Sequence, residues 1–159
     1  MNIVIIGATS GIGKALFEKY ARGDNRIGIV GRRANLLDEL CQKYPSKTIT
    51  AKADITNLEE IEQAINALHK ELEYIDLAIV CSGIGDINAT LEYNVERLTI
   101  DTNITGWTFV IDSLYNIFVQ QGHGHLVAIT SAGGLRGEPM APAYSASQAY
   151  QINSMEPLR

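Results

Sequence analysis

The chain has 159 residues, which is enough for one domain with a hydrophobic core and too few for two. It is 46% apolar and 19% charged, as soluble globular proteins are, and its net charge of −5 argues against nucleic acid or an anionic membrane surface as a partner. It has no basic signal segment, no apolar run of bilayer length and only two cysteines, so we expect one cytoplasmic domain over residues 1–159 without a metal site.

The start of the chain combines a buried strand, a glycine-rich turn and the beginning of a helix. Residues 2–6 are mostly β-branched and apolar, and Gly7-Ala8-Thr9-Ser10-Gly11-Ile12-Gly13 follows at once. Gly7 allows a tight exit from the strand, Gly11 lets backbone N–H groups approach a diphosphate, and Gly13 lets the helix pack closely. A glycine turn that binds nothing is the alternative, but the strand–helix pattern that follows favours a dinucleotide site.

The remaining chain alternates strands with helices. Further strands are expected at residues 26–30, 48–53, 76–81 and 126–130, and helices at 13–22, 34–44, 56–72, 94–121 and 143–159. Thr56 and Glu59 have capping-box spacing at the start of the third helix, and Pro157 should end the last one. With right-handed crossovers, this order predicts an α/β, Rossmann-type doubly wound parallel sheet with strand order 3-2-1-4-5.

The end of the second strand bears on the choice of cofactor. A carboxylate there would bind the hydroxyls of an adenosine ribose and repel a 2′-phosphate. This chain has Gly31, Arg32 and Arg33 instead. Guanidinium groups suit a phosphate dianion by charge and by paired N–H donors, so the sequence predicts NADP (NADPH) in preference to NAD. The alternative is that both arginines are solvated surface charges.

Several polar residues further along the chain extend the pattern. Asn103 lies between apolar turns of the long helix, Ser131 follows the fifth strand, and Tyr144 comes thirteen residues after Ser131. With the G-x-x-x-G-x-G spacing, this order resembles the short-chain dehydrogenase/reductase family over the whole chain. In that family the serine polarises the substrate carbonyl, the tyrosine gives or takes the proton, and the asparagine holds a helix kink and a water linked to a lysine.

The resemblance also implies the members of the site. Asp54, after the third strand, would accept a hydrogen bond from the adenine amino group, although an ordinary loop or helix-capping role is the alternative. The expected catalytic residues are Asn103, Ser131, Tyr144 and Gln148. The expected cofactor-binding residues are Gly7, Thr9, Ser10, Gly11, Ile12, Gly13, Gly31, Arg32, Arg33, Asp54, Ile55, Cys81, Ser82 and Gly83.

Three positions depart from the family pattern. Ile6 replaces a threonine before the first glycine, and Cys81 replaces an asparagine; we interpret Cys81 as a packed thiol of raised pKa, not a nucleophile. Gln148 stands where the family has a lysine that holds ribose hydroxyls and lowers the pKa of the tyrosine. Since glutamine is neutral, we expect a rate loss on the order of 10²–10³ and alcohol oxidation shifted to alkaline pH.

The chain is also short for this family. Relatives usually continue with two further strands and a lid over the substrate, so we expect the last strands to be missing and the fifth strand to form an exposed edge. A second copy would cover that surface in a homodimer or homotetramer. Trp107, Phe109 and Phe118 are candidate contacts, with burial in the core of the same chain as the alternative.

Three functions remain open from the sequence. The first is an NADP-dependent oxidoreductase that reduces a small carbonyl compound, or oxidises the alcohol, and is impaired by Gln148 and the short C-terminus. The second is a non-catalytic dinucleotide-binding module. The third is a truncated remnant of such an enzyme. The substrate is not specified by any residue pattern.

Overall fold

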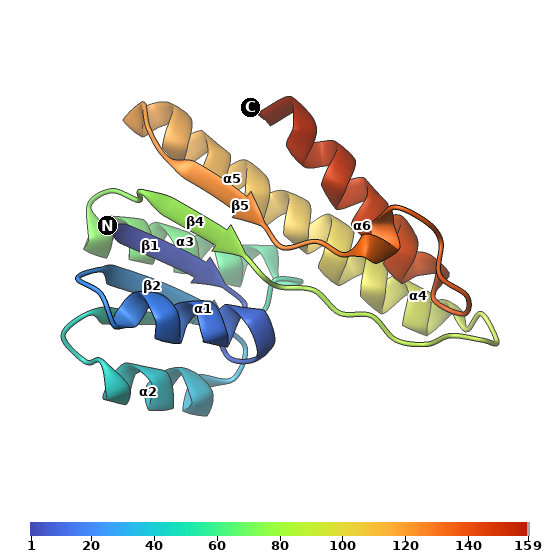
Figure 1. Cartoon of the computed structure of the whole chain (residues 1–159), viewed down its shortest axis with the longest axis horizontal. Helices are drawn as coiled ribbons and strands as arrows, with labels where there is room; N and C mark the ends of the chain where they lie inside the picture. Colours follow the sequence, from blue (N-terminus) through green and yellow to red (C-terminus); the bar gives the residue numbers. More distant parts are fainter. Residues whose placement is uncertain (159) are drawn as a thin grey trace.

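The computed structural model describes residues 1–158, and its centre is a five-stranded parallel sheet (Figure 1). The strands are β1 (Asn2–Ile6), β2 (Arg26–Gly31), β3 (Thr48–Lys52), β4 (Leu77–Val80) and β5 (His125–Ala128). The helices are α1 (Gly11–Ala21), α2 (Ala34–Lys43), α3 (Leu58–Leu72), α4 (Tyr93–Ile100), α5 (Trp107–Gln121) and α6 (Pro142–Met155). The strand order β3-β2-β1-β4-β5 confirms the predicted topology.

Side-chain alternation along the strands builds two separate cores. In β1, Val4 and Ile6 pack with α3 and α5 on one face of the sheet, whereas Ile3 and Ile5 pack with α1 and α2 on the other. Figure 1 shows α1 and α2 in front of the sheet, with α3 and α5 behind it. Every residue of β1 is buried, as expected for a central parallel strand covered on both faces. The doubly wound arrangement is therefore confirmed.

The long helix expected at residues 94–121 is interrupted. It consists of α4, a π-helical turn η1 (Asp101–Gly106) and α5. Asn103 in this turn is fully buried, and its side chain bonds the backbone of Ile84 instead of facing solvent. A Cβ at Gly106 would overlap the carbonyl of Ile55, so the turn also packs against the backbone after β3. A π-turn inserts one extra residue, which re-aims the side chain at that point.

The start of α3 corrects one expectation. The capping pair is not Thr56 and Glu59 but Asn57 and Glu60: Asn57 Oδ1 accepts from Glu60 N at 3.3 Å, and Asn57 Nδ2 donates to Glu60 Oε1 at 3.0 Å. Thr56 instead donates through both its N and Oγ1 to Asp54 Oδ1. The N-cap lies one residue later than expected, because Thr56 already donates to the carboxylate of Asp54 in a local turn.

The aromatic residues of α5 correct a second expectation. Trp107 is 1% exposed and Phe118 is 8% exposed, and both belong to the core beneath the sheet, while Phe109 packs partly buried against that core. The proposed role of Trp107 and Phe118 in an intermolecular contact is therefore wrong, because the sheet of their own chain covers them. The oligomer itself stays a prediction.

The last strand and helix lie at the open side of the sheet. β5 is an edge strand of the sheet, as expected. A cavity of about 550 Å³ lies between α5, β5 and the end of α6. The helix α6 ends at Met155, and a 3₁₀ turn η3 (Glu156–Leu158) contains Pro157, which agrees with the predicted stop. Arg159, which closes the expected last helix and the expected domain, lies outside the described residues. Within residues 1–158, no helix is both long and apolar enough to cross a membrane.

Candidate active site

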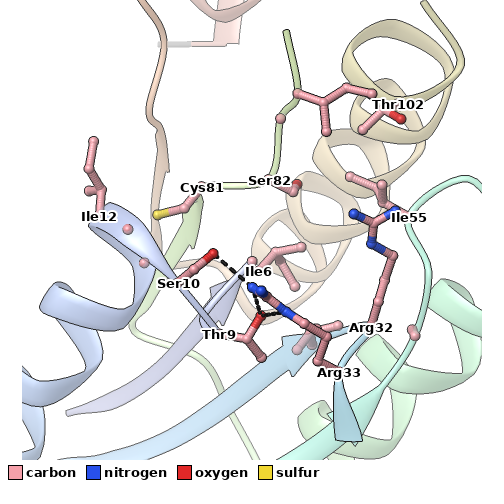
Figure 2. A pocket seen from close by; sticks show the side chains of 18 of the residues that line it. Ile6, Thr9, Ser10, Ile12, Arg32, Arg33, Ile55, Cys81, Ser82 and Thr102 are labelled. Carbon is pink, nitrogen blue, oxygen red and sulfur yellow. Dashed lines mark hydrogen bonds between the residues drawn. The ribbon is translucent and has the colours of Figure 1, made fainter. Parts of the chain in front are cut away.

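A cavity of about 420 Å³ opens at the carboxyl ends of β1, β2 and β4 (Figure 2). In a parallel α/β sheet this edge, where the strand order reverses, is where ligands bind. Thirteen of the fourteen expected cofactor-binding residues line it, namely Gly7, Thr9, Ser10, Gly11, Ile12, Gly13, Gly31, Arg32, Arg33, Ile55, Cys81, Ser82 and Gly83. Asp54 is the exception. The cavity is also lined by residues that the sequence analysis did not select, namely Ile6, Val30, Ala53, Ile61, Ile84, Thr102 and Ile129.

Most of these additional residues are the apolar neighbours of selected ones. Ile6 ends β1, Val30 is the next-to-last residue of β2, and Ala53 follows β3. Each comes directly before a selected residue, so the apolar residues at the strand ends are the signal that the sequence analysis missed. Ile84 follows Gly83, and Thr102 precedes Asn103. Ile61 comes from the first turn of α3 and has no local sequence signal, because only the packing of α3 under the sheet brings it to the cavity wall.

The glycine turn holds the floor of the cavity by close packing. Gly7 has φ of +87°, a conformation that favours glycine. A Cβ at Gly7 would also lie 2.8 Å from the backbone N of Ser82, at the end of the neighbouring strand β4, so two independent constraints require glycine at residue 7. A Cβ at Gly13 would overlap the carbonyl oxygen of Gly7. Because both positions are closed to side chains, α1 starts directly against the strand. The first residues of α1, Gly11, Ile12 and Gly13, line the cavity, and the first N–H groups of a helix have no partner within it.

The end of β2 brings two arginines to the cavity in different ways. Arg33 is bound to the glycine turn: its Nη2 donates to Thr9 Oγ1 and to Ser10 Oγ, both at 2.8 Å, and its Nε donates to Thr9 Oγ1 at 3.2 Å. Figure 2 shows these bonds as dashed lines. Arg32 lies 3.7 Å from Asp54 Oδ2 and remains largely exposed. Arg33 is therefore not a freely solvated charge, whereas Arg32 is loosely paired.

Gly31 completes this corner of the site. It is buried at the end of β2, and a Cβ there would lie 2.7 Å from the methyl carbon of Thr9. Thr9 thus has two contacts, a hydroxyl that accepts from Arg33 and a methyl that fills the space beside Gly31. No carboxylate side chain fits at residue 31 unless Thr9 moves.

Asp54 stands beside the cavity, not in its wall. Burial raises the pKa of its carboxyl, but the hydrogen bonds from Thr56 and the charge of Arg32 outweigh this effect, so the pKa lies below its ordinary value. Its Oδ1 is used by Thr56, so the loop-structuring role considered from the sequence is present in the structure. The contact with an adenine stays a prediction.

Cys81 and Ser82 form the wall contributed by the end of β4. Burial raises the pKa of the Cys81 thiol to about 11, so the thiolate is scarce at neutral pH, as expected from the sequence. The hydroxyl oxygen of Ser82 is buried and has no hydrogen-bond partner. A buried hydroxyl without a partner at a cavity wall is a ready contact for a polar ligand. Residues 1–158 contain no group of three His, Cys, Asp or Glu side chains placed to hold a metal ion.

The four expected catalytic residues, Asn103, Ser131, Tyr144 and Gln148, are not among the residues that line the cavity. Asn103 Oδ1 accepts from Ile84 N at 2.9 Å, and its Nδ2 donates to Ile84 O at 2.7 Å and to Ser147 Oγ at 3.0 Å. Asn103 therefore joins the segment after β4 to α6. The side chain of Ser131, after β5, accepts from Gly133 N at 3.1 Å in the short helix η2 (Ala132–Gly134).

Tyr144 and Gln148 occupy adjacent turns of α6. A Cβ at Gly85 would overlap the ring of Tyr144, so this ring packs directly on the loop after β4. Gln148 is 4% exposed, and its Oε1 has no hydrogen-bond partner. A Cβ at Gly134 would lie 2.7 Å from the carbonyl carbon of Gln148, so the segment after Ser131 packs on the same helix. The structure thus brings the loops after β4 and β5 onto the helix that carries Tyr144 and Gln148.

The comparisons with known proteins agree with this geometry. A sequence profile described as "short chain dehydrogenase" matches residues 1–158. The chain belongs to the short-chain dehydrogenase family. Among similar curated sequences, an uncharacterized oxidoreductase of Myxococcus xanthus is 32% identical over 98% of this chain and 64% of that protein. An uncharacterized oxidoreductase of Mycobacterium tuberculosis is 34% identical over 99% of this chain and 66% of that protein.

Solved structures of short-chain dehydrogenases extend the comparison. Serine dehydrogenase from Escherichia coli superposes with a TM-score of 0.92 and 25% identity, covering 100% of this chain and 75% of that one. The closed form of serine dehydrogenase complexed with NADP⁺ gives a TM-score of 0.93 at 25% identity, covering 100% of this chain and 65% of that one. This chain spans just under two thirds of the Myxococcus and Mycobacterium relatives.

Proposed function

We propose that this chain binds NADP and acts as an oxidoreductase that reduces a small carbonyl compound or oxidises the corresponding alcohol. The observation that carries the proposal is the corner of the cavity at the end of β2, where Arg33 and Arg32 stand beside a Gly31 that has no room for a side chain. A site without a carboxylate and with two guanidinium groups favours a 2′-phosphate over a free ribose hydroxyl.

The cavity suits a dinucleotide in other respects. The start of α1 offers N–H groups and a partial positive charge to the diphosphate, and the unpartnered hydroxyl of Ser82 offers a donor and acceptor at the wall formed by the end of β4. The serine dehydrogenase structure complexed with NADP⁺, which matches this chain over its whole length, supports the same type of ligand. NADP is therefore preferred over NAD on the chemistry of the cavity walls.

The residues of α6 and its two loops supply the chemistry toward substrate. The nicotinamide, when bound, supplies or accepts the hydride. The hydroxyl of Tyr144 donates the proton to the carbonyl oxygen in reduction, and the hydroxyl of Ser131 polarises that carbonyl. Asn103 fixes α6 against Ile84 through three hydrogen bonds. Gln148 offers its unpartnered Oε1 to a ribose hydroxyl but supplies no positive charge, so reduction suffers less than alcohol oxidation.

A non-catalytic dinucleotide-binding module is the second candidate. The neutral, buried Gln148 favours it, because this side chain supplies no charge to support an ionised phenol at Tyr144, one turn earlier in α6. The two candidates share the cavity and differ only in turnover. A folded chain that binds NADPH but does not consume it with any of a panel of aldehydes and ketones would be such a module.

Fluorescence titration with NADPH and NADH tests the binding site directly. We expect NADPH to bind more tightly, and Arg33→Ala to lower its affinity by roughly ten- to a hundredfold, since charged hydrogen bonds are worth about 1.5–3 kcal/mol. NADH affinity should change little. Arg22→Ala, an exposed arginine at the far end of α1, serves as control and should leave both affinities unchanged. Equal affinity of the wild-type chain for the two coenzymes would overturn the preference for NADP.

A further inference from the structure

The helix that carries Tyr144 has no capping side chain of its own. Ala141 occupies the N-cap of α6 and makes no side-chain hydrogen bond, and Pro142 is the first helical residue. A carboxylate from another helix takes this place: Glu96 of α4 accepts from Ala143 N through Oε2 at 2.9 Å. Figure 1 shows α4 beside the start of α6. A negative charge at a helix N-terminus is stabilising, because it faces the free N–H groups and the positive end of the dipole.

The second oxygen of Glu96 is also used. Its Oε1 accepts from Nδ2 of Asn88, which lies in the loop between β4 and α4. Asn88 is 4% exposed and its other polar atoms are all bonded: Oδ1 accepts from Glu92 N, its backbone N donates to Met140 O at 2.6 Å, and its carbonyl accepts from Leu91 N. We call Asn88, Glu96 and the amide of Ala143 the latch, because these groups join the loop after β4 to both α4 and α6.

Two residues with strained backbone conformations are hydrogen-bonded to Asn88 of the latch. Leu91 has φ of +56° and Met140 has φ of +62°, the left-handed region that is unfavourable for residues other than glycine. Both bond directly to the backbone of Asn88. Strained backbone persists where surrounding contacts hold it, and it is concentrated at functional sites. The loop between β4 and α4, which contains Leu91, and the loop before α6, which contains Met140, are therefore joined in one defined arrangement by the backbone hydrogen bonds of Asn88.

The latch adjoins Tyr144 on two sides. Ala143, whose amide binds Glu96, is the preceding residue of α6, and Gly85, on which the ring of Tyr144 packs, precedes Asn88 by three residues in the same loop. We propose that Glu96 is a positioning residue, which sets the place of Tyr144 relative to the loop after β4 through Asn88 and the amide of Ala143. This inference rests on the proposed function, in which Tyr144 transfers the proton.

The test compares Glu96→Gln with Glu62→Gln, which changes an exposed glutamate of α3. Glutamine keeps the size of the side chain but removes the charge and replaces one of the two acceptor oxygens with a donor. Three properties are measured for each variant. They are the hydrogen exchange of the peptide covering residues 141–148, the dissociation constant for NADPH, and kcat and KM for a carbonyl compound that the wild-type chain reduces. Hydrogen exchange reports on the latch even in a chain that lacks turnover, so failure of the proposed function is distinguishable from failure of the latch.

For Glu96→Gln we expect faster exchange at residues 141–148, a fall in kcat on the order of ten- to a hundredfold, and an NADPH affinity within about twofold of wild type. Glu62→Gln should change none of these. The proposal is overturned if Glu96→Gln leaves exchange and kcat at wild-type values. It is also overturned if kcat and NADPH binding fall together in proportion to the loss of folded protein, because a merely structural role would give that result.

Discussion

The two halves of the proposed site are built differently. The cofactor half is made of strand ends and a glycine turn, and its closest contacts are backbone contacts, such as Gly13 against Gly7 and Gly7 against Ser82. The substrate half is made of two loops and α6, and it is held by side chains such as Asn103 and Glu96 that reach between distant segments. The first half is therefore held by close packing of the backbone around the strand ends, whereas the second is held by a few side-chain hydrogen bonds between distant segments.

This difference bears on one of the three departures from the family pattern, the glutamine at residue 148. Gln148 lies in the substrate half, is buried with an unpartnered side-chain oxygen, and is not among the residues that line the cofactor cavity. A change at residue 148 therefore alters chemistry without altering the cofactor cavity. A change in the glycine turn alters the cavity and the sheet together. The following substitutions separate the two halves.

Gln148→Lys should have the largest effect. A positive charge one turn after Tyr144 favours the ionised phenol, so alcohol oxidation near neutral pH should rise on the order of 10²–10³-fold, which corresponds to about 3–4 kcal/mol. NADPH affinity should change by a much smaller factor. Gln148→Met, which has similar length and no charge, is the control and should not raise the rate. Steady-state oxidation rates measured across pH decide between these outcomes, and an unchanged profile in Gln148→Lys would contradict the assigned role of residue 148.

Gly13→Ala should have the next largest effect. Because its Cβ would overlap the carbonyl of Gly7, we expect the free energy of unfolding to fall by about 2–3 kcal/mol and NADPH affinity to fall with it. Gly11→Ala is the matched comparison: Gly11 has φ of +52°, but a Cβ there would have no heavy atom within 4 Å, so a cost of about 1 kcal/mol is expected. Denaturant unfolding measures the loss of unfolding free energy in both variants. An equal loss in Gly13→Ala and Gly11→Ala would contradict the importance of close packing at Gly13.

Gly31→Asp tests the corner where Thr9 fills the space beside β2. Alone, the substitution should displace Thr9 and weaken the binding of both coenzymes by roughly ten- to a hundredfold, without creating a preference for NADH. Combined with Thr9→Ser, which removes the methyl and keeps the hydroxyl that binds Arg33, it should bind NADH more tightly than Gly31→Asp alone. Titrations of the single and double variants decide this. Thr9→Val keeps a methyl in the space beside residue 31. If Gly31→Asp combined with Thr9→Val also recovered NADH binding, the steric explanation would be contradicted.

Asp54→Asn should have the smallest effect. The folded pKa of Asp54 lies below its ordinary value of 3.8, so its contribution to stability is present above that value and is lost as the pH falls through the folded pKa. Since the side chain is substantially exposed, the contribution should be below about 1 kcal/mol. Unfolding at pH 7 and in acid measures it. The wild type and the variant should differ at pH 7 and converge in acid, and the opposite trend would contradict the assigned shift.

The predictability of the site follows the same division. The glycine turn, the strand order and thirteen of the residues that line the cavity can be inferred from sequence, because glycines and the polar residues that follow strands carry local signals. The sequence pattern places the capping pair of α3 one residue too early, because Asp54 uses Thr56 first. Trp107 and Phe118 fit a contact between chains as well as a core, because an apolar side chain has the same sequence pattern in both settings.

The sequence by itself determined the alternation of strands and helices, the glycine turn and the pair of arginines after β2, since these depend on neighbours within a few residues. Only the tertiary structure decided that Arg33 binds the glycine turn, that Thr9 closes the space beside Gly31, that residues 101–106 form a π-turn, and that Glu96 caps α6. Most of these contacts join segments that the sheet brings together from distant parts of the chain, and hydrogen-bond geometry over such separations has no local sequence signal.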